Sequence, residues 1–101
     1  MNSNVLIVDD SLTVRMDLAD AFESAGFRPV LCSSIREARD AFSAQAIDLV
    51  ILDVLLPDGD GVHLLEEIRN DPATGGLPIL MLSSEADVKD RIRGLKTGAN
   101  D

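Results

Sequence analysis

One stretch near the start of the chain decides the fold: Val5-Leu6-Ile7-Val8-Asp9-Asp10, four apolar residues followed directly by two carboxylates. A short apolar run rich in β-branched side chains is typical of a strand that is buried on both faces of a parallel sheet. The same pattern returns over residues 49–52 and ends at Asp53. The two runs predict two central strands, each with acidic residues at its carboxyl end.

Helix-period segments and further apolar runs surround these two strands. An apolar stripe predicts a helix over residues 11–25, and Gly26 is a typical residue to end it. A weaker strand over residues 27–32 contains Pro29, which lacks an amide donor and is therefore expected at a sheet edge. Ser34 and Glu37 fit a capping box that opens a second helix. The stripes of the two helices are Val14, Leu18, Ala21, Phe22 and Ala25 in the first, and Ile35, Ala38, Ala41 and Phe42 in the second.

The second half of the chain continues the alternation. Residues 56–61 have strong turn chemistry and predict a loop, as do residues 71–78. A short helix with Val62, Leu65 and Ile68 lies between them, and a fourth strand covers residues 79–82. A last helix carries Val88, Ile92 and Leu95 and is closed by Gly98. The order βαβαβαβα predicts an α/β fold, a doubly wound parallel sheet with right-handed crossovers and helices on both faces.

The composition limits the functions open to this chain. Its 101 residues, 46% hydrophobic and 27% charged, are typical of one globular domain. Eighteen acidic residues against nine basic ones give a net charge of −9, which argues against direct nucleic-acid binding and against docking on anionic membranes. One cysteine and one histidine exclude an internal disulfide and a zinc site built from several such residues. With neither a signal peptide nor a membrane-spanning run, we expect a cytoplasmic protein.

The residues that follow the strands form the candidate site. Asp9, Asp10, Asp53 and Ser83 stand at strand ends, and ligand sites of open α/β sheets lie beyond the carboxyl ends of the strands. Crowded carboxylates repel one another, and Mg²⁺ is a usual partner for such a set. An aspartate there can also act as a nucleophile and form an acyl phosphate. The alternative is ordinary turn chemistry, in which Asp10 or Ser11 only caps the first helix.

Four segments together resemble one known family, the receiver domain of two-component response regulators. They are residues 5–11 with the acidic pair, Leu52-Asp53 followed by Pro57 and Asp60-Gly61, residues 81–84 with Ser83 and Ser84, and residues 98–101. The resemblance extends over the whole chain. It implies a flavodoxin-like sheet with strand order 2-1-3-4 and a phosphoacceptor role for Asp53. It also implies a Mg²⁺ site formed by Asp9, Asp10, Asp53 and the backbone carbonyl of Leu55, with Ser83 as the switch hydroxyl.

The resemblance further implies a signalling role. The phosphoryl donor would be a histidine kinase or a phosphotransfer protein, with a possible effector domain in the full-length protein. The domain would be a phosphoacceptor and not a steady-state enzyme, because Leu55 stands where aspartate-nucleophile phosphatases carry an acid–base aspartate. The alternative is a degenerate receiver that binds a partner without being phosphorylated.

One departure from the family concerns the end of the chain. The family continues with a fifth strand, which ends in a lysine, and a fifth helix, and both would follow Asp101. The expectation is therefore a single receiver domain over residues 1–101 that is incomplete at its C-terminus. The strand over residues 79–82 would then be an exposed apolar edge, for which self-association is expected.

Overall fold

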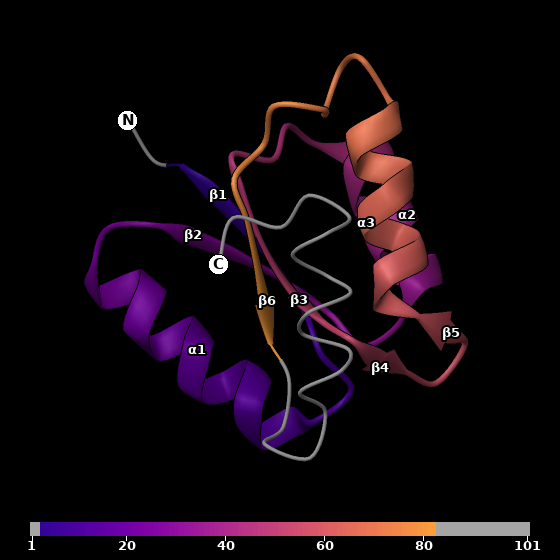
Figure 1. Cartoon of the computed structure of the whole chain (residues 1–101). Coiled ribbons are helices and arrows are strands. Elements are labelled where there is room, and N and C mark those ends of the chain that lie inside the picture. The colour runs from indigo at the N-terminus through magenta and orange to yellow at the C-terminus, as the bar shows by residue number, and fades with distance from the viewer. Residues whose placement is uncertain (1–2, 83–101) are drawn as a thin grey trace.

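Four parallel strands form the central sheet of the computed structural model, which describes residues 3–82. The order across the sheet is β2-β1-β3-β6, so the predicted order 2-1-3-4 is confirmed (Figure 1). Pro29 lies in the edge strand β2, as its missing amide donor requires. The strands are β1 (Asn4–Val8), β2 (Arg28–Cys32), β3 (Leu49–Asp53) and β6 (Ile79–Leu82).

The helices cover both faces of this sheet. Helix α1 (Leu12–Ser24) lies on one face, whereas α2 (Ile35–Ala44) and α3 (Gly61–Asn70) lie together on the other (Figure 1). Alternate residues of the central strands point to the two layers, because successive side chains of a strand face opposite ways. The face under α2 and α3 contains Leu6, Val8, Val50 and Leu52, and the face under α1 contains Val5, Ile7 and Ile51. All seven are buried, which explains the continuous apolar runs.

The buried face of α1 differs from the predicted stripe. Leu18 and Phe22 pack on the sheet as expected, but Val14 is exposed, as are Ala21 and Ala25. The inward face instead carries Arg15 and Ala19 beside Leu18 and Phe22, so it is turned by less than one residue step of about 100° around the helix axis. Arg15 lies on this face and is partly buried, and its guanidinium donates to the carbonyl of Asp9 at 2.6 Å. A long side chain with a polar end can cover apolar surface in this way, and apolar periodicity does not detect it.

Helix α1 ends at the predicted glycine. Gly26 has a φ of 92°, a left-handed conformation that glycine adopts without steric cost. Its amide donates to the carbonyl of Glu23, and the amide of Phe27 donates to the carbonyl of Phe22 at 2.9 Å. The rings of Phe22 and Phe27 meet edge to face with centroids 5.4 Å apart. This is a Schellman ending with its usual apolar contact, and it directs the chain into β2.

The capping box of α2 is shifted by one residue from the prediction. The hydroxyl of Ser34 accepts from the amide of Glu37 at 3.1 Å, as expected. The carboxylate of Glu37, however, accepts from the amide of Ser33 at 3.0 Å and from its hydroxyl at 2.8 Å. These hydrogen bonds hold the pKa of Glu37 below its usual value. Two side chains of the local segment, Ser34 and Glu37, thus form part of the cap of α2.

Replacing Ser34 with alanine is expected to lower the free energy of unfolding by about 1 kcal/mol, because the amide of Glu37 loses its acceptor. Urea unfolding followed by circular dichroism measures the change. Threonine at this position keeps a hydroxyl and should retain most of the stability. Equal stability of the wild type and the Ser34→Ala protein would contradict this role.

The segment after β3 is more regular than the predicted loop. Its ends pair as two short antiparallel strands, β4 (Leu55–Leu56) and β5 (Gly59–Asp60), with Leu55 opposite Asp60. The turn residues Pro57 and Asp58 lie at the tip. Two residues per strand are too few for a periodicity signal, so turn chemistry alone was visible in the sequence.

Several predictions fall on residues that the structure does not describe. The last helix with Val88, Ile92 and Leu95, its closing Gly98, and Ser83 and Ser84 all lie outside residues 3–82. Strand β6 pairs with β3 and stands last in the order of the described sheet, and self-association through it stays a prediction. None of the described helices has the length and apolar character needed to cross a membrane.

Candidate functional site

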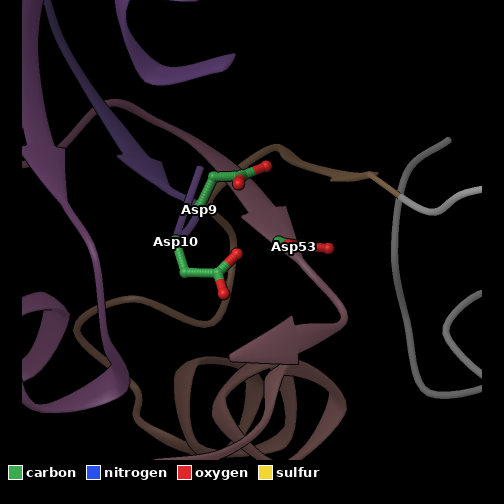
Figure 2. Close-up of side chains that lie close together, drawn as sticks. All are labelled: Asp9, Asp10 and Asp53. Carbon is green, nitrogen blue, oxygen red and sulfur yellow. The ribbon is translucent and has the colours of Figure 1, made fainter. Parts of the chain in front are cut away.

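The acidic residues of the two central strands meet at one edge of the sheet. β1 and β3 are neighbours in register, with Val8 opposite Leu52, so the residues that follow them emerge side by side. Carboxylate oxygens of Asp9, Asp10 and Asp53 all lie within 4.8 Å of one another. Figure 2 shows the three side chains extending from the ends of the two strands into one region. The predicted convergence is confirmed.

Asp9 is the buried member of this cluster, with 6% of its surface exposed. Its amide donates to the carbonyl of Cys32 in β2 at 3.0 Å, and its carbonyl accepts from Arg15. Its carboxylate oxygen Oδ1 accepts from the amide of Ser11 at 2.8 Å. Asp9 is therefore held by β2, by the start of α1 and by an α1 side chain, which fixes where its charge points.

Asp10 is the exposed member, and the alternative role predicted for it is not observed. The N-cap residue of α1 is Ser11, whose hydroxyl accepts from the amide of Val14 at 3.3 Å. Asp10 instead contributes its carboxylate to the cluster with Asp9 and Asp53. Helix capping thus explains the position of Ser11. It does not explain why the three aspartates cluster, which a functional site does.

Asp53 is the half-buried member, and its environment disfavours the charged form. Burial and the facing carboxylates of Asp9 and Asp10 raise its pKa from an ordinary value of 3.8 to about 6. A long hydrogen bond of 3.4 Å from the amide of Leu55 to Oδ1 works in the opposite direction. The negative charges of the cluster are thus only partly compensated by the described residues.

Gly61 is a site residue whose role the sequence reasoning missed. A Cβ atom at this position would lie 2.0 Å from the carbonyl oxygen of Asp53 and 3.1 Å from the Cα of Val54. The amide of Gly61 donates to the carbonyl of Val54 at 2.7 Å. The start of α3 therefore rests directly on the backbone of the central aspartate. The one signal in the sequence was the Asp60-Gly61 pair in a turn-rich segment, and such a pair is equally typical of an ordinary turn.

The other acidic residues near the site are structural. Asp60 caps α3, because its Oδ1 accepts from the amide of Val62 at 2.8 Å. Asp58 accepts from the first amides of α2. His63 is exposed and Cys32 is buried, and burial raises the pKa of the Cys32 thiol to about 11. Neither of these two residues belongs to the acidic cluster.

The arrangement has two chemical capacities. Three carboxylates with one buried member are a donor set for a hard divalent cation, which prefers oxygen ligands and would relieve the repulsion that raises the pKa of Asp53. The carboxylate of Asp53 stands between buried strand and solvent, where it can act as an oxygen nucleophile. The carbonyl of Leu55 and the hydroxyl of Ser83 stay predicted members of the site. Ser83 directly follows Leu82, the residue that pairs with Asp53 across β3 and β6.

Comparison with known proteins agrees with this geometry. Residues 5–101 match the response regulator receiver domain family. The fold is similar to the crystal structure of a candidate response regulator from Chloroflexus aurantiacus, with a TM-score of 0.93, 39% identity and coverage of 100% of this chain and 83% of that one. It is also similar to the chemotaxis response regulator CheY4 of Vibrio cholerae, with a TM-score of 0.89, 28% identity and coverage of 98% and 82%.

Proteins of similar sequence support the same family. The chain is 32% identical over 101 residues to the phosphate regulon transcriptional regulatory protein PhoB of Escherichia coli, covering 100% of this chain and 44% of that protein. It is 38% identical over 97 residues to the transcriptional activator protein PfeR of Pseudomonas aeruginosa, covering 96% of this chain and 31% of that protein. The chain spans less than half the length of these relatives.

The family match places this chain in a class of signalling phosphoacceptors, as distinct from steady-state enzymes, and the acidic cluster beyond the central strands agrees with that class. Within that class, the chain belongs to the response regulator receiver domains of two-component systems. Receiver domains work with histidine kinases, and the resemblance found in the sequence is confirmed.

Proposed function

We propose that Asp53 is the residue that accepts the phosphoryl group, in a two-component signalling switch. The carboxylate oxygen of Asp53 forms a bond to phosphorus, while the bond from phosphorus to a histidine nitrogen of the kinase or phosphotransfer protein breaks. The electron pair of the broken bond stays on the imidazole, which then takes a proton from water. The observation that carries this proposal is the clustering of Asp9, Asp10 and Asp53 within 4.8 Å at the ends of β1 and β3.

The proposal includes a Mg²⁺ site. Asp9, Asp10, Asp53 and the backbone carbonyl of Leu55 would hold the ion, which supplies positive charge against the oxygens of the incoming phosphoryl group. The described residues fit such an ion, because their carboxylates face one another and raise the pKa of Asp53. Asp9 is oriented by Ser11, Arg15 and Cys32 before any ligand arrives.

The remaining parts of the proposal concern the response. Ser83 would donate a hydrogen bond from its hydroxyl to the phosphoryl group. This contact would couple phosphorylation to a change in the order and position of nearby segments. The donor would be a cytoplasmic histidine kinase domain or a phosphotransfer protein. Two relatives are transcriptional regulators, which supports an effector domain that controls transcription in the full-length protein.

Incubation with acetyl phosphate and Mg²⁺ is expected to add one phosphoryl group, which mass spectrometry of the intact protein detects and peptide mapping places on Asp53. The Asp53→Asn protein should remain unlabelled. Asp10→Asn should weaken Mg²⁺ binding severalfold and slow labelling, because the cluster loses one charge. The labelling is measured on this chain and, in parallel, on a chimera. In the chimera, Asp101 is followed by the fifth strand and fifth helix of another receiver domain, which include the lysine that ends the fifth strand in this family.

Mapping of the phosphoryl group to Asp9 or Asp10 would overturn the assignment of Asp53. No labelling of either the chain or the chimera would overturn phosphorylation altogether and favour the alternative, a receiver that binds its partner without modification. Labelling of the chimera alone would show that the site is competent and that its activity depends on the added segment.

A further inference from the structure

The tip of the β4–β5 hairpin is bound to the first turn of α2. The carboxylate of Asp58 accepts from the amide of Ile35 at 2.9 Å through Oδ1 and from the amide of Arg36 at 3.0 Å through Oδ2. These two amides have no partner within the helix, because the first amides of any α-helix lie before the first i to i−4 carbonyl. Ser34 serves the next amide, that of Glu37. One carboxylate from a distant segment thus completes the cap of α2.

An apolar contact accompanies these hydrogen bonds. A Cβ atom on Gly59 would lie 2.8 Å from the Cδ1 atom of Ile35, so the hairpin backbone rests closely on that side chain. Ile35 itself is buried, with 5% of its surface exposed. Gly59 also has a φ of 157°, in a region that side chains rarely allow. The hairpin therefore meets α2 through polar and apolar contacts on adjacent residues.

The same hairpin leads directly to the central aspartate of the site. Leu55, the first residue of β4, donates its amide to the Asp53 carboxylate and is paired with Asp60 across the hairpin. Asp60 in turn caps α3. A hairpin with two residues in each strand is not stable alone, so its shape depends on its attachments at both ends. One attachment is the α3 cap by Asp60, and the other is the α2 contact by Asp58.

We propose that Asp58 is a positioning residue for the acceptor site: it fastens the β4–β5 hairpin to α2 and thereby holds the Leu55 amide against the Asp53 carboxylate. Asp58 does not touch the reacting atoms, and it acts through the hairpin. Its effect on phosphoryl transfer rests on the proposed function of Asp53, whereas its effect on the hairpin does not. The carboxylate suits the place because a negative charge is favourable at a helix N-terminus.

Support for this role comes from the charge state of the carboxylate. The hydrogen bonds from the amides of Ile35 and Arg36 hold the pKa of Asp58 below its usual value, so the group is ionised near neutral pH. Asparagine at this position would present one acceptor oxygen in place of two and no charge. Alanine would present neither an acceptor nor a charge, and the amides of Ile35 and Arg36 would be left to donate to water.

The test compares Asp58→Ala and Asp58→Asn with two controls in the whole chain. Ser34→Ala removes a cap from the same helix end but does not touch the hairpin. Asp40→Asn removes a charge from an exposed position of α2. We expect hydrogen exchange of the Leu55 amide to speed up about tenfold in Asp58→Ala, to speed up less in Asp58→Asn, and to match the wild type in both controls. The rate constant of labelling by acetyl phosphate should fall about tenfold in Asp58→Ala, without a change in its dependence on phosphodonor concentration.

Unchanged exchange at Leu55 in Asp58→Ala would overturn the proposal. It would also be overturned if Ser34→Ala had the same effect, because fraying of α2 would then be the cause. Failure of the wild type to become labelled in the chain and in the chimera would overturn the proposed function of Asp53, and the exchange rates would still decide the role of Asp58. Faster exchange with an unchanged labelling rate would restrict that role to the hairpin and overturn its part in phosphoryl transfer.

Discussion

Replacing Asp53 with asparagine is expected to raise the free energy of unfolding of the metal-free protein by about 1–2 kcal/mol near neutral pH. Burial and the carboxylates of Asp9 and Asp10 raise the pKa of Asp53 from 3.8 to about 6, so the folded state disfavours its charge. A rise of that size corresponds to roughly 3 kcal/mol at most. Because Asp53 is only half-buried, solvent screening reduces this figure.

The stabilisation should depend on pH in a definite direction. Below the unfolded-state pKa of 3.8, Asp53 is protonated in both states, and aspartate and asparagine should be equally stable. Between 3.8 and about 6 the unfolded chain releases the proton while the folded chain retains it, so the wild type loses stability as the pH rises. Above that window the advantage of asparagine should be constant.

Urea unfolding in the presence of a chelator, at a series of pH values, measures this difference. Asp40→Asn is the control, because Asp40 is exposed on α2 and lies outside the acidic cluster. Added Mg²⁺ should stabilise the wild type and reduce the advantage of Asp53→Asn, since a ligand that binds only the folded state adds to its stability. A wild type as stable as Asp53→Asn at neutral pH without metal would show that the carboxylates do not repel as the geometry indicates.

Replacing Gly61 with alanine is expected to lower the free energy of unfolding by about 3 kcal/mol. The added Cβ would lie 2.0 Å from the Asp53 carbonyl oxygen and 3.1 Å from the Cα of Val54, and backbone atoms in a buried strand end cannot turn aside as a flexible side chain can. The start of α3 would have to move away from β3. Because Gly61 also donates to the carbonyl of Val54, that hydrogen bond would be stretched or lost.

The matched control is Gly76→Ala. A Cβ at Gly76 meets nothing within 4 Å and its φ is not in the left-handed region, so alanine should leave stability unchanged or raise it slightly. Thermal and urea unfolding of the two variants measure the difference. A Gly61→Ala protein as stable as Gly76→Ala would mean that α3 and the end of β3 adapt without cost, and the close approach would have no structural importance.

The sequence alone determined the layers of this fold and the members of the acidic cluster. Strands buried on both faces must be almost wholly apolar, so β1 and β3 are visible as uninterrupted runs. Asp9, Asp10 and Asp53 stand out because each follows such a run directly. Pro29 marked the edge strand for an equally local reason, since it has no amide to donate. These are properties of single residues and short periods.

Only the tertiary structure decided which surfaces meet. The inward face of α1 includes Arg15, because its guanidinium donates to the carbonyl of Asp9. The apolar periodicity of the helix does not predict this contact. The sequence pattern predicts a turn at Asp58, yet Asp58 caps a helix that begins 23 residues earlier in the chain. The sequence pattern places Gly61 in a turn, yet its lack of a side chain allows α3 to lie against the backbone of Asp53. Each of these roles depends on the distance between groups far apart in sequence, which is set by the packing of whole elements and not by the residues around each one.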